Sequence, residues 1–226
     1  MAERSVLVTG GTGGLGAAVL AAFAAQGWRV VAPVRSGTAT VPDGVRVVEA
    51  DLLEPAGAQA AVEAAAEEPG APLRAVVNLV GGYAAGGLVH ETPIDDFEAM
   101  VRLNLRPTYL VTAAALPLLT DSGGSIVCVS SRAAVAPFPG AAGYVTAKAA
   151  VLAFASAVAA EYRQHGVRCN TVLPSVIDTP ANRAGQPGAD PSRWVTPAEI
   201  AEVILFLAGD ASAPMSGASV PVYGRA

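Results

Sequence analysis

The chain has 226 residues, of which 52% are hydrophobic and 15% are charged, and its formal net charge is −5. This length favours one domain with a large core, and the lack of a basic run argues against nucleic acid and anionic membranes as partners. The N-terminus shows no basic segment before an apolar one, so we expect no signal peptide. The longest apolar helical stretch, 149–160, is about a dozen residues, which is too short to span a bilayer, and we expect a cytoplasmic protein.

Short β-branched runs alternate with helical segments along the whole chain. We expect strands at 5–9, 28–34, 45–49, 73–80, 124–130, 167–173 and 218–222. We expect helices at 17–26, 55–68, 143–164 and 197–207, and two helical segments within 92–119 with Asn104 between them. The alternation predicts a doubly wound parallel α/β sheet with helices on both faces. The 180–192 segment is expected to be a surface loop.

The first predicted strand runs into a glycine-rich turn and then into a helix. The turn comprises Gly10, Gly11, Thr12, Gly13, Gly14, Leu15 and Gly16. A turn of this kind presents backbone N–H groups and a positive helix end to a phosphate, and glycine permits close approach. A plain strand–helix turn is the alternative, but the position between strand and helix favours a dinucleotide site.

The end of the second predicted strand bears on the choice of dinucleotide. Many such sites place a carboxylate there to bind the ribose, whereas this strand is followed by Arg35 and Ser36. A guanidinium matches the geometry of a 2′-phosphate, and Ser36 adds a hydroxyl. We therefore expect NADP(H) rather than NAD(H), with a solvated loop charge as the alternative for Arg35.

Two further strand ends carry polar residues. Asp51 follows the third strand and is expected either to accept from an adenine amino group or to cap the next helix. Asn78 lies at the end of the fourth strand, before the flexible 81–87 loop. Ligands of open α/β sheets bind at such carboxyl ends. Thr196, with Glu199 close behind it, is the expected N-cap of the helix at 197–207.

Tyr144 and Lys148 stand four residues apart in a predicted helix, so both side chains lie on one face. An ammonium beside a phenol favours the phenolate and lowers its pKa, which would make Tyr144 a general acid or base. The pair alone also occurs by chance. Cys128 and Cys169 are expected to be core residues, and we expect no metal site.

With these motifs together, the chain resembles the short-chain dehydrogenase/reductase family over nearly its whole length. The matching residues are Thr9-Gly10-x-x-x-Gly14-x-Gly16, Asp51, Asn78-x-Val80-Gly81, Asn104, Ser131 and Tyr144-x-x-x-Lys148. The resemblance implies a single Rossmann-like domain, 1–226, with about seven strands in the order 3-2-1-4-5-6-7. A short substrate loop is expected at about 180–194.

The resemblance implies hydride transfer between nicotinamide and a carbonyl or alcohol carbon. Tyr144 would be the general acid or base, and Ser131 would bind the same oxygen. Lys148 would lower the Tyr144 pKa and hold the ribose. Asn104 would keep a water beside Lys148, with a distorted backbone. Ser130 is expected to be structural, because alternation along the strand points it to the other face.

The resemblance also extends the set of cofactor contacts beyond the glycine-rich turn. The full expected set is Gly10, Thr12, Gly13, Gly14, Leu15, Gly16, Arg35, Ser36, Asp51, Leu52, Asn78, Val80, Gly81, Tyr144, Lys148, Pro174, Ile177 and Thr179. Thr179 and the backbone of Ile177 would hold the carboxamide. The apolar helix around 149–160 implies a homodimer or homotetramer, since the family pairs the equivalent helix with its mate.

Three departures from the family pattern stand out. Pro174-Ser175 replaces the usual Pro-Gly, and the segment from Thr179 to Trp194 is short for a substrate lid. The 81–84 loop looks like that of dihydropteridine reductases, a branch that typically lacks the catalytic serine. Because Ser131 is present, we do not transfer the pterin substrate.

The leading hypothesis is an NADP-dependent reductase or dehydrogenase of a small carbonyl or alcohol compound. The alternatives are an NAD-linked alcohol dehydrogenase, a dihydropteridine-reductase-like enzyme, and a subunit whose partner supplies the lid. A non-catalytic NADP-binding sensor or scaffold is the alternative of another class. Its usual mark is the loss of the catalytic tyrosine or lysine, and both are present here.

Overall fold

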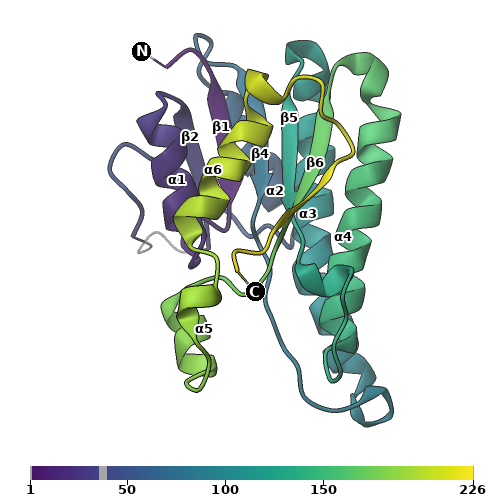
Figure 1. Ribbon diagram of the computed structural model, residues 1–226. Helices are drawn as coiled ribbons and strands as arrows, with labels where there is room; N and C mark the ends of the chain where they lie inside the picture. The colour runs from purple at the N-terminus through teal and green to yellow at the C-terminus, as the bar shows by residue number, and fades with distance from the viewer. Residues whose placement is uncertain (1, 36–39, 226) are drawn as a thin grey trace.

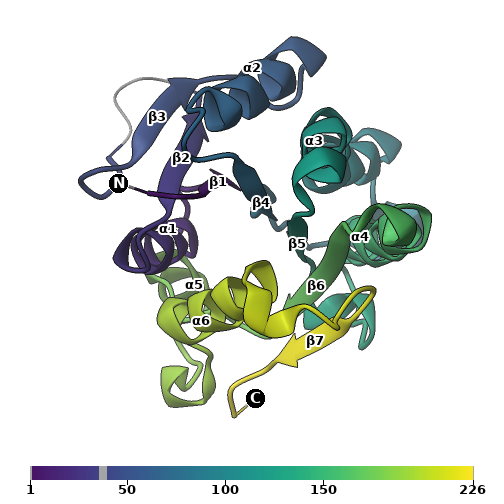
Figure 2. The same ribbon diagram turned by 90° about the horizontal axis from the view of Figure 1, so that it is seen from above.

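A computed structural model describes residues 2–35 and 40–225, and these residues form one parallel sheet with helices on both faces (Figures 1 and 2). The strands are β1 (Ser5–Thr9), β2 (Arg29–Val34), β3 (Arg46–Glu49), β4 (Leu73–Asn78), β5 (Ser125–Val129), β6 (Arg168–Pro174) and β7 (Ser219–Val222). Their order is β3-β2-β1-β4-β5-β6-β7, and all neighbours pair in parallel. The predicted fold class and strand order are therefore confirmed.

The helices divide between the two faces of the sheet, as the view from above shows (Figure 2). They are α1 (Gly16–Ala25), α2 (Pro55–Ala66), α3 (Ile94–Ser122), α4 (Ala142–Glu161), α5 (Pro180–Gly185) and α6 (Pro197–Ala208). α1 and α6 cover one face, and α2, α3 and α4 cover the other. Short 3-10 turns at Val89–Glu91, Arg132–Ala134, Arg163–His165, Pro191–Arg193 and Asp210–Ser212 connect them.

The alternation of side chains along β1 shows why two cores form. Val6 and Val8 pack in the core beneath α1 and α6, whereas Leu7 packs in the core on the α2–α4 side. All three are fully buried. A strand buried on both faces reads as a continuous apolar run, which is the pattern that predicted this strand.

The expectation of two helical segments within 92–119 is wrong, because α3 is one helix of 29 residues. It passes through Asn104 and contains Pro107 and Pro117. Each proline removes one backbone hydrogen bond. The buried face carrying Val111, Ala115 and Leu119 outweighs this loss, since packing of an apolar stripe supplies most helix stability.

One smaller expectation also needs correction, and another is confirmed. The 180–192 segment is not wholly irregular: α5 begins after Thr179, whose side chain accepts from the Asn182 N–H at 3.2 Å, and Pro180 occupies the first turn. The predicted cap of α6 is confirmed, because Thr196 and Glu199 form a complete capping box. The ends of the other elements match the expected ones to within three residues, a difference that is common at helix and strand ends.

α4 is longer than the 149–160 stretch that was judged too short for a bilayer. It has 20 residues and is, among the described residues, the one helix long and apolar enough to cross a membrane by length and composition. This property is weak evidence for a span, because helices packed in protein cores pass the same test. Val151, Ala155 and Val158 of α4 are indeed buried in the core.

Candidate functional site

The predicted site residues gather at the carboxyl ends of the parallel strands. This is the lower edge of the sheet in Figure 1, where α5 also lies. The glycine-rich turn follows β1, the 79–93 loop follows β4, and Ser131 follows β5. The first turns of α4 bring Tyr144 and Lys148 to the same edge. Side chains from segments distant in sequence thus converge because parallel strands end together.

Lys148 is the only lysine among the 226 residues, and it is buried, with 6% of its surface exposed. Its Nζ donates to the Val129 carbonyl at 3.1 Å. The Nζ lies 6.0 Å from the centroid of the Tyr144 ring. Burial lowers the pKa of Lys148 from 10.5 to about 8, because the charged form loses hydration. The ammonium is therefore still the main form near neutral pH.

The pKa of Tyr144 is raised, not lowered, and this corrects the expectation from the Tyr144–Lys148 spacing. Burial of the phenol is the main cause, a hydrogen bond with the Ser131 hydroxyl opposes it, and the nearby Tyr83 adds to the rise. The phenolate would lose its hydration in this half-buried position, and that cost outweighs the hydrogen bond with Ser131. Tyr144 consequently holds its proton firmly.

The two serines at the end of β5 have different partners. Ser131 lies beside Tyr144, and its Oγ accepts a hydrogen bond from the Ala133 N–H at 3.1 Å. The Ser131 hydroxyl also hydrogen-bonds the Tyr144 phenol, so the two hydroxyl groups lie side by side. Ser130 is buried and donates to the Lys148 carbonyl at 2.7 Å. Ser130 thereby fastens α4 to β5 at the turn that carries Lys148.

Asn104 points from α3 toward the loop after β4. Its Oδ1 accepts from the Gly82 N–H at 3.2 Å, and its Nδ2 donates to the Gly82 carbonyl at 3.1 Å and the Met100 carbonyl at 3.0 Å. A Cβ added to Gly81 would lie 2.6 Å from Asn104 Oδ1 and 3.1 Å from Lys148 Nζ. Asn104, Gly81 and Lys148 are therefore in mutual proximity. The expected backbone distortion is absent, since α3 continues unbroken through Asn104.

The glycine-rich turn fits a phosphate-binding role. Gly10 adopts a positive φ of 68°, and Thr12, Gly13 and Gly14 are exposed. Leu15 occupies the N-cap position of α1 without a side-chain cap hydrogen bond, so the first N–H groups of α1 lack a side-chain acceptor. Such N–H groups and the helix dipole attract anions. A Cβ on Gly14 would lie 2.7 Å from Thr179 Cγ2, which shows that the turn and the loop after β6 are in contact.

The ends of β2 and β3 lie side by side at this edge of the sheet. The Ala50 N–H donates to the Val34 carbonyl at 2.8 Å, so the following residues Arg35 and Asp51 are brought near each other. Both are exposed, and Leu52 is buried. Ser36 lies outside the described residues.

Asp51 does not cap a helix, and that alternative is wrong. Its Oδ1 accepts from the Leu53 N–H at 2.9 Å and closes a turn ahead of α2. Glu54 takes the N-cap position of α2 instead. Among the described residues, none donates a hydrogen bond to the other carboxylate oxygen of Asp51.

Asn78 does not face the open edge with its side chain. It is 3% exposed, and its Nδ2 donates to Thr112 Oγ1 at 3.1 Å and to Cys128 Sγ at 3.8 Å. Among the described residues its Oδ1 is buried without a hydrogen-bond partner. The buried side chain of Asn78 therefore links β4 to α3 and to β5 inside the protein, and it does not point into the site at the edge of the sheet. Cys128 and Cys169 are both free and buried, as expected.

The loop after β4 also meets the glycine-rich turn through its backbone. Val80 is half-buried, and a Cβ on Gly10 would lie 3.0 Å from its backbone nitrogen. The turn and the start of the 79–93 loop are therefore neighbours at the site.

The segment after β6 is organised by hydrogen bonds of its own. The Ile177 carbonyl accepts from the Thr179 N–H at 2.9 Å and from Asn182 Nδ2 at 2.8 Å. Pro174 is buried at the end of β6. Ser175, which stands where the family carries glycine, donates to the Tyr223 carbonyl at 2.7 Å. Its hydroxyl is thus turned toward the C-terminal segment.

Two aromatic residues near Tyr144, Tyr83 and Phe138, belong to none of the sequence motifs that predicted the site. The Tyr83 ring lies edge-on to Tyr144, with centroids 5.1 Å apart, and 6.5 Å from the Phe138 ring. Two exposed aromatic residues in glycine- and proline-rich loops were the available signal. Trp194, at the end of the short segment after β6, is only 9% exposed.

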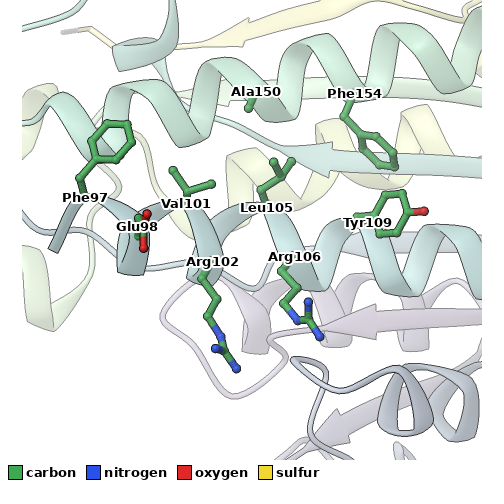
Figure 3. A pocket seen from close by; sticks show the side chains of 9 residues that line it. All are labelled: Phe97, Glu98, Val101, Arg102, Leu105, Arg106, Tyr109, Ala150 and Phe154. Atoms are coloured by element: carbon green, nitrogen blue, oxygen red, sulfur yellow. The ribbon is translucent and has the colours of Figure 1, made fainter. Parts of the chain in front are cut away.

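A second hollow lies apart from these residues, between α3 and α4 (Figure 3). It has a volume of about 540 Å³. Its lining comprises Phe97, Glu98, Val101, Arg102, Leu105, Arg106, Tyr109, Ala150 and Phe154. Figure 3 shows Arg102 and Arg106 pointing away from the apolar floor. None of the predicted catalytic or cofactor residues lines this groove.

The geometry agrees with comparisons to known proteins. The family model described as short chain dehydrogenase matches residues 4–189. The chain belongs to the short-chain dehydrogenase/reductase family. It is therefore an oxidoreductase, and its substrates are small molecules. Relatives include 2-(R)-hydroxypropyl-CoM dehydrogenase of Xanthobacter autotrophicus, which is 33% identical over 98% of both chains. The (3R)-3-hydroxyacyl-CoA dehydrogenase of Rattus norvegicus is 33% identical over 96% of this chain and 94% of its own.

Solved structures of this dehydrogenase/reductase family superimpose over the whole fold. A short-chain dehydrogenase/reductase from Mycobacterium ulcerans has a TM-score of 0.91 and 27% identity, covering 100% of this chain and 90% of its own. A 3-ketoacyl-(acyl-carrier-protein) reductase from Brucella melitensis, complexed with NADH, has a TM-score of 0.85 and 26% identity, covering 99% and 98%. ElxO with NADP bound, at 23% identity, has a TM-score of 0.90 and covers 98% of both chains. The Brucella melitensis reductase, at 26% identity, was thus solved with a nicotinamide cofactor, and the likeness to ElxO shows the shared fold.

Proposed function

We propose that this chain is an NADPH-dependent reductase of a small carbonyl compound, with Tyr144 as the proton donor. The observation that carries the proposal is the convergence of Ser131, Tyr144 and Lys148 at one edge of the sheet, beside the uncapped glycine-rich turn. When bound, the nicotinamide supplies the hydride to the carbonyl carbon or accepts it in the reverse direction. The protein side chains manage the proton and the charge on oxygen.

Tyr144 and Ser131 act on the substrate oxygen. Negative charge develops there during reduction, and Tyr144, whose raised pKa keeps it protonated, donates its proton. The Ser131 oxygen accepts a hydrogen bond from the Ala133 N–H. Its own hydroxyl hydrogen is donated to the same substrate oxygen. Tyr144 becomes a phenolate when it has donated its proton, and the Lys148 ammonium, on the same face of α4, stabilises that phenolate. Asn104 keeps the base of the adjacent loop in place.

The residues around the edge fit a dinucleotide in an extended arrangement. The N–H groups at Gly14 and Leu15 would hold the pyrophosphate, while the Gly13 N–H donates to the Gly10 carbonyl at 3.0 Å and shapes the turn. Lys148 would hold the ribose hydroxyls next to the nicotinamide. The free carboxylate oxygen of Asp51 would accept from adenine. Ile177 and Thr179 would hold the carboxamide, because the contact of Gly14 with Thr179 brings their loop over the turn.

The preference for NADPH rests on Arg35, which is exposed directly after β2. Fluorescence titration with NADPH and NADH tests it, on the wild type, on Arg35→Ala and on the control Arg163→Ala. Arg163 is an exposed arginine beyond the C-terminal end of α4. We expect NADPH to bind at least about tenfold more tightly than NADH, which is about 1.4 kcal/mol, and Arg35→Ala alone to remove most of that preference. Equal binding of both cofactors would leave an NAD-linked dehydrogenase as the better assignment.

We further propose that the enzyme is a homodimer or homotetramer that pairs through the groove of Figure 3. Phe154 and Tyr109 line it with rings 5.8 Å apart. Alanines at 153 and 157 on α4 are exposed and allow a second helix to approach closely. Sedimentation of Ala157→Arg should show dissociation, whereas Ala60→Arg, on the exposed face of α2, should sediment as the wild type.

There are two alternatives to this proposal. One is a protein that binds NADP as a sensor without catalysis, and the other is an enzyme similar to the dihydropteridine reductases of the same family. Oxidation of NADPH by the purified protein with a simple carbonyl compound excludes the sensor. A quinonoid dihydropterin as the preferred substrate would favour the second alternative. A cytoplasmic location stays a prediction from the sequence.

A further inference from the structure

Two loops that flank Tyr144 carry exposed apolar side chains. The 79–93 loop follows β4, the 131–141 loop follows β5, and the Gly86 N–H joins them by donating to the Gly140 carbonyl at 2.8 Å. Tyr83, Val135 and Phe138 are 62%, 56% and 44% exposed. An exposed apolar group of this kind at a site marks a surface that a ligand can desolvate.

The aromatic side chains form a corner over the proposed proton donor. The Tyr83 and Tyr144 rings meet at 88° with centroids 5.1 Å apart, and the Tyr83 and Phe138 rings are inclined at 45° with centroids 6.5 Å apart. These separations lie within the range of attractive aromatic contacts. An aromatic ring of a substrate, next to the reacting carbonyl, could therefore pack against the rings of Tyr83 and Phe138.

The base of the corner is held firmly although Tyr83 itself is exposed. Both backbone groups of Gly82, the residue before Tyr83, are bonded to the Asn104 side chain. A Cβ on Gly82 would lie 2.6 Å from Leu103 Cδ2, so this peptide is also packed against α3. Anchoring of this kind limits the entropy that is lost when a ligand binds.

The charged side chains of the two loops are turned to partners of their own. Glu91 accepts from the Leu88 N–H at 2.8 Å, and His90 lies 3.9 Å from Glu91. The Arg132 guanidinium lies 5.1 Å from the Tyr223 ring centroid. Neither loop, both described in full, thus presents an unengaged cation for a phosphate or carboxylate on the substrate. A neutral apolar substrate matches this surface better than an anionic one.

We propose that Tyr83 and Phe138 form a substrate-binding aromatic wall and that the preferred substrate is a neutral carbonyl compound with an aromatic ring next to the carbonyl. This inference rests on the proposed function, since it places the ring beside the carbonyl that Tyr144 protonates. The wall sets specificity and leaves proton transfer to Tyr144.

Steady-state reduction of two similar diones tests the wall. We would compare kcat/KM for 1-phenylpropane-1,2-dione and hexane-2,3-dione in the wild type, Tyr83→Ala, Phe138→Ala and the control Phe206→Ala. Phe206 is 45% exposed, much like Phe138, but lies on α6. We expect the wild type and the control to prefer the phenyl compound by about tenfold or more, and each wall variant to lose most of that preference through KM. The proposal would be rejected if the wild type had equal kcat/KM for the two diones, or if the variants lost kcat/KM equally for both.

Binding of unreactive amides separates this inference from the proposed function. Calorimetric titration of 2-phenylacetamide and hexanamide into the NADPH-loaded protein needs no turnover. Tighter binding of the phenyl amide that Tyr83→Ala abolishes would support the wall even if neither dione were reduced, in which case the reductase assignment would fail alone. Reduction of both diones with no preference, and equal binding of both amides, would reject the wall and leave the reductase standing.

Discussion

The lowered pKa of Lys148 makes the stability of the folded protein depend on pH in a direction opposite to that of a lysine whose pKa is raised by an ion pair. A drop from 10.5 to about 8 corresponds to about 3 kcal/mol of lost stability while the ammonium is charged. Below pH 8 the folded and unfolded states both carry the charge, and the folded state bears the whole cost. Between pH 8 and 10.5 the unfolded state binds more protons, so stability rises with pH.

Lys148→Met isolates this contribution. Methionine removes the charge and the hydrogen bond to Val129, and the loss of that bond does not depend on pH near neutrality. The unfolding free energies of variant and wild type are measured by urea denaturation at one protein concentration. Between pH 7 and 10.5 the wild type should gain about 3 kcal/mol of stability relative to the variant. The variant should also be inactive.

The unique lysine permits a direct measurement. Protein labelled with ¹³C only at lysine Cε gives one side-chain resonance, since the sequence has one lysine. Its titration midpoint should lie near pH 8, and kcat/KM for reduction, which reports the free enzyme, should fall as pH rises through the same value. A midpoint near 10.5, or a pH-independent difference between Lys148→Met and wild type, would refute the argument from burial.

Three further substitutions test the site and the fold. Tyr144→Phe should lower kcat by about 10²–10⁴-fold with unchanged NADPH affinity. The control Tyr162→Phe, at the far end of α4, should behave as wild type. Equal activity of the two variants would show that Tyr144 takes no part in the chemistry. Gly81→Ala places a Cβ 2.6 Å from Asn104 Oδ1 and should cost about 1–3 kcal/mol, while Gly70→Ala, with its nearest atom at 3.9 Å, should cost much less. Thr196→Ala breaks the capping box of α6 and should cost about 1 kcal/mol in urea denaturation; no loss would mean that the cap is replaced by solvent.

Local patterns allowed much of this protein to be predicted without a structure. Burial on both sides of a parallel strand produces continuous apolar runs, and the strand predicted at Ser5–Thr9 is β1 as observed. The Thr196–Glu199 capping box depends on residues three apart, so it too could be read directly. The spacing of Tyr144 and Lys148 predicted one helix face for the same reason.

Properties that depend on distant neighbours were decided only in the tertiary structure. The continuity of α3 through Pro107 depends on the sheet against which it packs, and the direction of the Asn78 amide depends on Thr112 and Cys128. The contact of Tyr83 with Phe138 joins two loops 55 residues apart, and no short-range pattern reports it.

The sequence by itself determined the order of strands and helices and the chemical groups available at the carboxyl edge. The tertiary structure decided their protonation and their partners. Spacing suggested that Lys148 would lower the pKa of Tyr144, yet burial raises the Tyr144 pKa and lowers that of Lys148. The physical reason is that desolvation depends on everything packed around a group, and residues from many segments of the chain supply that packing.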